Sequence, residues 1–168
     1  MIAYKFLAAG RLGPFTGFQW EPGTWFDAPA TDLCTRGIHA CRVRDLPIWL
    51  HEELWEIELD GEVVEGDRKL VATRGRLTKR TERWTPEVAH EFGRFCARRT
   101  RERVGFLPFL SGFVFDVDRF VAENRIAIAG FAAARAAELR DGAKAYDAER
   151  RAQASWLAER LELDQPIT

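Results

Sequence analysis

The segment Leu54-Trp55-Glu56-Ile57-Glu58-Leu59-Asp60-Gly61 decides the class of fold that the rest of the sequence must accommodate. Apolar and acidic residues alternate along it, which is the period of a β-strand with one buried and one exposed face. Glu56 and Glu58 share the second face, which we expect to be solvated or to supply a carboxylate to a cleft. Asp60-Gly61 is a hairpin signal and predicts a return strand over residues 62–65.

Further extended segments flank this one. Ile2–Leu7 is aromatic and β-branched and predicts a first strand. Residues 69–77 predict another extended segment, interrupted by Gly75. Asp45-Leu46-Pro47 predicts the start of a short helix that ends near Glu53, because Asp caps free N–H groups and Pro fits the first turn.

The period changes to that of a helix after Thr85. Thr85-Pro86-Glu87 predicts a helix start, and a second helix is expected from Asp116 or Asp118 to Asp141-Gly142. A third helix follows, with Ala145, Ala148, Ala152 and Trp156 on one stripe. Strands followed by helices predict an α+β fold, with a small twisted antiparallel or mixed sheet packed against C-terminal helices. We expect a β-rich domain at 1–80 and a helical region at 85–163, packed together as one structural unit.

The composition fits a globular domain. The chain has 168 residues, of which 46% are hydrophobic and 12% aromatic, enough for a core and unlike a disordered chain. No run approaches the roughly 20 apolar residues of a membrane helix, so we expect no membrane association. No secretory signal is visible, and three cysteines are too few for a disulfide framework, so we expect a cytoplasmic protein.

The formal net charge of −1 conceals three blocks. Residues 1–67 carry a net −7, residues 68–103 a net +8 and residues 104–168 a net −2. The middle block would attract nucleic acid or another acidic partner, or would pair with the acidic first block within one fold. Its last part, on the predicted helix from Thr85, is a basic stripe without interleaved exposed aromatic residues. The stripe consists of Arg94, Arg98 and Arg101.

Two cysteines and a histidine, Cys34, His39 and Cys41, fall within one short segment. A zinc site would take these three and a fourth ligand from Cys96, His51 or His90. Because this spacing matches no standard ligand pair, we expect no cofactor. The alternatives are a Cys34–Cys41 redox pair, a cysteine nucleophile with His39 as its base, and two buried cysteines acting as small apolar side chains, which we favour.

Several pieces of residues 1–80 resemble a family of small bacterial and bacteriophage proteins that share a G-[IF]-H-A-C segment, a domain of unknown function. The matching pieces are Tyr4-Lys5, Gly17-Phe18-Gln19-Trp20-Glu21-Pro22-Gly23, Leu33-Cys34-Thr35-Arg36-Gly37-Ile38-His39-Ala40-Cys41, Trp55-Glu56-Ile57-Glu58-Leu59-Asp60-Gly61 and Lys69-Leu70-Val71-Ala72. The helical half resembles actinobacterial relatives in composition. The resemblance implies a domain and no particular activity.

The order of these segments is also similar to the ADP-ribosyltransferase-like plan. Gly37-Ile38-His39 stands where those enzymes carry a Gly-x-Tyr segment, and Lys5 is the only basic residue on the first strand. The plan implies a catalytic glutamate on a later strand. The candidates are Glu56, Glu58 and Glu62.

Three functional hypotheses follow. The favoured one is a small-molecule binding protein for a flat aromatic or nucleotide-like ligand, with a pocket between the sheet and the helices. Its predicted lining is Lys5, Trp20, Trp25, His39 and Trp49. The second is an enzyme of transferase or cyclase type, ADP-ribosyltransferase-like, that uses the same cleft with His39 as the acid–base residue. The third is binding of nucleic acid or an acidic partner through residues 68–103.

Overall fold

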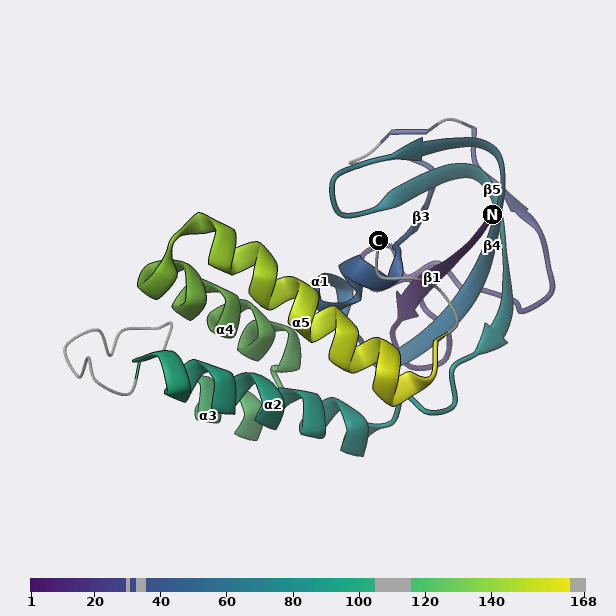
Figure 1. Ribbon diagram of the computed structural model, residues 1–168. Coiled ribbons are helices and arrows are strands. Elements are labelled where there is room, and N and C mark those ends of the chain that lie inside the picture. The colour runs from purple at the N-terminus through teal and green to yellow at the C-terminus, as the bar shows by residue number, and fades with distance from the viewer. Residues whose placement is uncertain (30, 33–35, 105–115, 164–168) are drawn as a thin grey trace. The chain divides into compact units, whose positions relative to one another are not determined.

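The computed structural model describes residues 1–29, 31–32, 36–104 and 116–163. The chain forms two compact units, Met1–Thr85 and Pro86–Thr168. The first contains the strands and the second the long helices (Figure 1), so the α+β class is confirmed. In the described part of the chain, no helix is both long and apolar enough to cross a membrane.

The sheet of the first unit is antiparallel and centres on two long strands, β4 (Glu53–Glu65) and β5 (Leu70–Arg80), which run side by side (Figure 1). β1 (Ile2–Leu7) pairs with the edge of β4 that faces away from β5. The short strands β2 (Phe26–Asp27) and β3 (Ile38–Ala40) both pair with the edge of β5 that faces away from β4. The predicted first strand is therefore confirmed.

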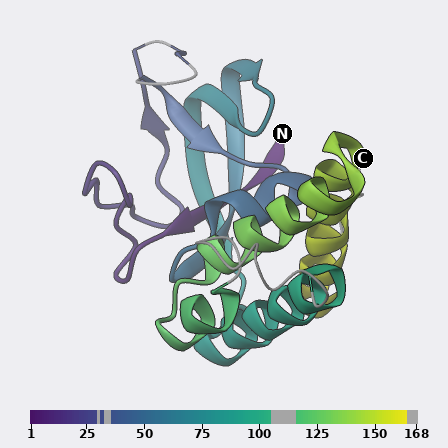
Figure 2. The same ribbon diagram turned by 90° about the vertical axis from the view of Figure 1, so that its left-hand side faces the viewer.

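The strand pairings close into a ring. Directly after β3, the Cys41 amide donates to the Tyr4 carbonyl at 2.7 Å, and the Tyr4 amide donates to the Cys41 carbonyl at 2.9 Å. This bridge joins the end of β3 to β1, so one face of the strands is turned inward. The loop that follows β1 projects from the strands (Figure 2) and leads back to the inner face at Trp20, which is only 5% exposed.

The prediction of a hairpin turn at Asp60-Gly61 is wrong. β4 continues through these residues to Glu65, and the pairing with β5 shifts register between Asp60 and Val63, which marks a bulge. The chain reverses instead at residues 66–69, where the Gly66 amide donates to the Lys69 carbonyl at 2.8 Å. β5 also runs without interruption through Gly75.

The inner face carries the hydrophobic core of the first unit. Its buried members are Ala3, Leu7, Trp20, Ile38, Ala40, Trp55, Ile57, Leu59, Leu70, Ala72 and Leu77. The short helix predicted from Asp45 is α1 (Leu46–Trp49), preceded by a 3-10 turn, η1 (Val43–Asp45), and it ends before Glu53. The Asp45 side chain does not cap it, because this carboxylate accepts from Arg42 Nε at 2.8 Å.

The second unit consists of α2 (Pro86–Val104), α3 (Val117–Ala122), α4 (Ile126–Asp141) and α5 (Ala143–Leu161). α4 packs against both α2 and α5. The helix predicted from residue 116 to 141 is split in two at Asn124, whose φ of 57° is incompatible with a continuing right-handed helix. Alanines fill the α4 interface, so the helices pack closely.

Candidate functional site

Lys5 lies on the inner face of the sheet unit. On β1 its side chain lies on the same face as those of the buried Ala3 and Leu7. Its ammonium group lies 5.0 Å from the centre of the Trp20 ring. Lys5 Nζ also donates to the His39 carbonyl at 2.6 Å. Burial away from water lowers the pKa of Lys5 to about 8. Two predicted ligand residues, Lys5 and Trp20, thus come together with the backbone of a third.

The side chain of His39 points the other way. Its neighbours Ile38 and Ala40 belong to the inner core, so the half-buried imidazole lies on the opposite face of β3. Burial lowers the pKa of His39 below its ordinary value, and the positive charges of Lys69 and Lys5 lower it further. The imidazole is therefore neutral at pH 7. Its predicted acid–base role stays a prediction.

The two remaining predicted ligand residues, Trp25 and Trp49, lie apart from Lys5 and Trp20. The guanidinium groups of Arg74 and Arg76 lie 4.7 and 4.6 Å from the centre of the Trp25 ring. Trp49 Nε1 donates to the Arg68 carbonyl at 2.8 Å. Each tryptophan is half-buried against basic residues.

Two basic residues of β5, Arg74 and Arg76, are paired with acidic residues of the sheet unit. Arg76 donates to Glu58 at 2.5 Å, and Arg74 lies 3.7 Å from Asp60 and 3.6 Å from Asp27. The predicted pairing between the +8 block and the acidic first block therefore occurs on this strand. It also places Glu58, one of the candidate catalytic glutamates, in an ion pair on the outer face.

Cys41 is buried, and burial raises the pKa of its thiol well above the usual range, with the charge of Asp45 acting in the same direction. Such a thiol stays protonated and is a poor nucleophile or metal ligand. Cys34 lies outside the described residues, so the zinc and redox pairings with it stay predictions. Within the described ranges, no group of three or more His, Cys, Asp or Glu side chains could hold a metal ion.

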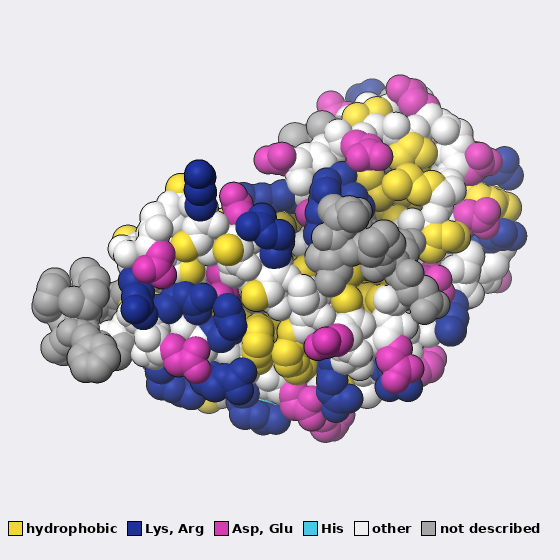
Figure 3. Space-filling view, viewed as in Figure 1, with side chains coloured by type: hydrophobic (Ala, Val, Ile, Leu, Met, Phe, Trp, Pro, Cys, Tyr) yellow, Lys and Arg dark blue, Asp and Glu magenta, His cyan; other side chains and the backbone are white. Residues whose placement is uncertain are grey.

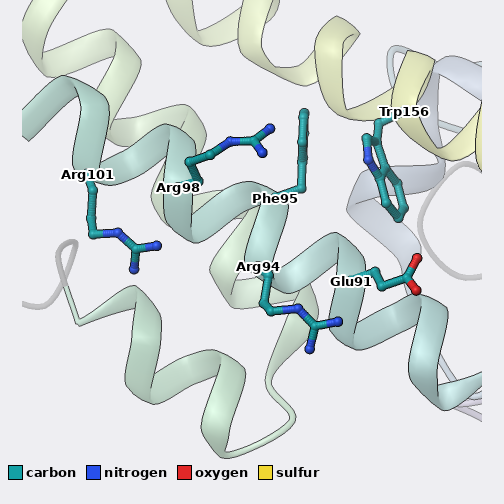
Figure 4. Close-up of a pocket in the computed structure, with 6 residues that line it drawn as sticks. All are labelled: Glu91, Arg94, Phe95, Arg98, Arg101 and Trp156. Carbon is teal, nitrogen blue, oxygen red and sulfur yellow. The ribbon is translucent and has the colours of Figure 1, made fainter.

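A groove of about 390 Å³ on the helical unit combines arginine side chains with aromatic rings. Its lining is Glu91, Arg94, Phe95, Arg98, Arg101 and Trp156 (Figure 4). The three arginines recur at positions i, i+4 and i+7 of α2, so their Cα atoms fall on one side of the helix, from which the side chains diverge (Figure 4). In Figure 3, Lys and Arg side chains gather over the helical unit, with hydrophobic side chains exposed beside them.

The rings in this groove come from two helices. Phe95 of α2 and Trp156 of α5 stack at 5.7 Å between centroids, with 28° between their planes. Both are half-buried, whereas Phe92, which also contacts Trp156 at 5.5 Å, is fully buried and anchors the pair. Two half-buried aromatic side chains, one on α2 and one on α5, therefore lie beside the basic stripe.

The charged residues of the groove differ in whether they form ion pairs with other side chains. Glu91 is held by Arg160 of α5 at 2.9 Å, which lowers the pKa of this carboxyl group. Arg98 and Arg101 lie near Glu102 and Asp118, at 3.8 and 2.5 Å. Arg94 is exposed and has no hydrogen bond or ion pair within the described part of the chain.

Two other α2 arginines have a structural role. Arg99 and Arg103 each lie 2.8 Å from the carboxylate of Glu149, which is 1% exposed. A buried carboxylate requires such partners, because an unpaired charge is costly away from water. On α2, therefore, Arg99 and Arg103 pair with a buried carboxylate of the helical unit, whereas the arginines of the stripe line the groove.

Comparison with known proteins adds no assignment: no family model, curated protein or solved structure matches the chain.

Proposed function

We propose that the protein binds nucleic acid through the α2 groove. The observation that carries the proposal is the placement of three arginines beside two half-buried aromatic rings in one groove. Arginine pairs with phosphate oxygens, and aromatic rings stack on bases. Arg94 to Arg101 extend over about 10 Å of helix at a rise of about 1.5 Å per residue, which favours a polymer with several phosphates over a single phosphate group.

The small-molecule hypothesis around His39 receives less support. Its five predicted residues are not gathered in one place, and Trp20 belongs to the hydrophobic core. The enzyme hypothesis rests on the same residues. Both remain predictions, and loss of turnover in a folded His39→Ala variant would be the evidence for the second.

Fluorescence anisotropy of a labelled 12-nucleotide single-stranded DNA tests nucleic-acid binding. If three phosphates are neutralised, log K falls with log salt at a slope of about −2, so a fourfold rise in NaCl weakens binding roughly 20-fold. Arg94→Ala should weaken binding and reduce the slope by about 0.7. Arg151→Ala is the matched control, because Arg151 is an exposed α5 arginine outside the groove.

The opposite charge in the groove supplies a second test. Glu91→Gln removes a carboxylate that repels phosphates and releases Arg160, so the affinity for DNA should rise severalfold. Glu159→Gln, on the exposed surface of α5, makes the same change in net charge outside the groove and should have a smaller effect. Absence of DNA binding at 50 mM NaCl, or equal effects of the groove and control variants, contradicts the proposed function.

A further inference from the structure

In the groove, the aromatic rings and two of the arginines point in different directions. Figure 4 shows Glu91 directed toward Trp156, and Phe95 and Arg98 extending from the same side of α2, whereas Arg94 and Arg101 extend away from Trp156. A chain of nucleotides has the same division, with flat bases on one side and charged phosphates on the other. The groove therefore matches a strand whose bases are turned toward α5.

The rings are held in place for stacking. Trp156 contacts both Phe95 and the buried Phe92, and guanidinium groups of Arg98 and Arg99 lie 5.7 and 5.2 Å from the Phe95 ring centre. Because these contacts fix the rings before binding, little side-chain freedom is left to lose when a base stacks on them. The Glu91 carboxylate, fixed by Arg160, repels phosphates from the side where the rings lie.

These observations distinguish between forms of nucleic acid. In a duplex the base faces are covered by neighbouring bases, so the half-buried rings of the groove reach them only after a base is unstacked, at a cost in free energy. In a single strand the base faces are accessible, and stacking on aromatic side chains together with arginine contacts is the usual mode of recognition.

We infer that the α2 groove is a single-strand site, in which a base stacks on the Phe95–Trp156 pair while Arg94 and Arg101 hold the flanking phosphates. This inference rests on the proposed function and narrows its ligand to unpaired DNA or RNA. It assigns Trp156 a binding role that the position of this residue on an alanine-rich helix does not indicate.

The test compares the full chain with labelled 12-nucleotide oligo-dT and with a labelled 12-base-pair duplex at 50 mM NaCl. We expect the single strand to bind at least tenfold more tightly. Trp156→Leu should weaken single-strand binding about tenfold, as expected for the loss of one stacked base, and change duplex binding less than twofold. Trp156→Phe keeps a ring and should retain most of the affinity.

Phe131→Leu is the matched control, since Phe131 is an exposed aromatic residue of the same unit, 42% exposed and outside the groove. Thermal melting identifies any variant that does not fold, and Phe95→Leu then replaces Trp156→Leu. Equal affinity for single strand and duplex, or unchanged single-strand binding by a folded variant without the ring, overturns this inference while the proposed function stands. Absence of binding to both probes overturns both.

Discussion

A lysine that precedes β5 contributes to the lowered pKa of His39. Lys69 opposes protonation of the half-buried imidazole, so Lys69→Met should raise the pKa of His39 toward its ordinary value of 6.5. The imidazole resonances in an NMR pH titration measure this, with the His39 signal assigned from a His39→Gln variant. Lys79→Met is the control, because Lys79 is an exposed lysine on β5 that does not affect His39. An unchanged pKa in the Lys69 variant contradicts this account of the electrostatics.

Lys5 should make stability depend on pH. Its pKa is about 8 in the folded protein and 10.5 in the unfolded chain, because folding buries the ammonium group. Between these values the unfolded chain holds a proton that the folded protein has released, so the free energy of unfolding rises with pH across the window. The rise attributable to Lys5 is about 3 kcal/mol at most over the whole window.

Urea unfolding at pH 8 and pH 10 measures this rise. Cysteines and tyrosines titrate in the same range, so the informative quantity is the difference between the wild-type protein and a Lys5→Met variant. The wild type should gain stability relative to the variant as the pH increases. A difference that stays constant or shrinks shows that the Lys5 amine is not desolvated by folding.

The residue pattern of a strand predicts which of its side chains are buried, but it does not predict which distant residues they contact. The alternation in residues 54–60 correctly assigned Trp55, Ile57 and Leu59 to the core, because strand geometry fixes which side chains share a face. The same rule could not show that Trp20 meets Lys5. That contact depends on a long loop that returns to the sheet, and no local pattern encodes where such a loop ends.

At the scale of elements, Gly61 shows why a turn signal was misread. Its φ is 72°, the left-handed conformation that the Asp-Gly pair predicts. Both a type I′ hairpin turn and a G1 bulge place a residue in this conformation, and only the pairing with β5 decides between them. The Asn124 break between α3 and α4 is comparable: asparagine tolerates positive φ, but hydrophobic periodicity alone does not reveal the interruption.

The bulge predicts a strong effect of Gly61→Ala. A Cβ atom there would lie 2.3 Å from Thr73 Oγ1, which accepts a hydrogen bond from the Glu62 amide at 3.0 Å. Strain at positive φ and disturbance of this bond should together lower the free energy of unfolding by about 2–3 kcal/mol. Gly10→Ala is the control: its φ is 75°, but no atom lies within 4 Å of the added Cβ.

Chemical denaturation of both variants gives the comparison. Gly10→Ala should cost about 1 kcal/mol, from backbone strain alone. A Gly61→Ala cost no larger than that of Gly10→Ala contradicts the close packing of the bulge against Thr73.

At the scale of the whole molecule, net charge concealed the candidate site. The helical unit, residues 86–168, has 13 basic and 13 acidic residues, so its balance predicts no attraction to phosphates. The site arises because Glu149 engages Arg99 and Arg103, while Arg94, Arg98 and Arg101 line the groove. The arginine stripe is visible in the sequence, but the place of Trp156 beside it is not, because a contact between residues 95 and 156 exists only in the folded unit.

The division into two compact units predicts that each folds when produced alone. Residues 1–85 have the inner core of the sheet, and residues 86–168 have a separate core built from the α4 alanines, Phe92 and Leu157. Each fragment should therefore unfold cooperatively in a circular dichroism melt. The 86–168 fragment should bind oligo-dT within about threefold of the full chain, because it holds every residue that lines the groove. Binding confined to the 1–85 fragment, or a folded 86–168 fragment with no affinity, would show that the α2 groove is not the nucleic-acid site.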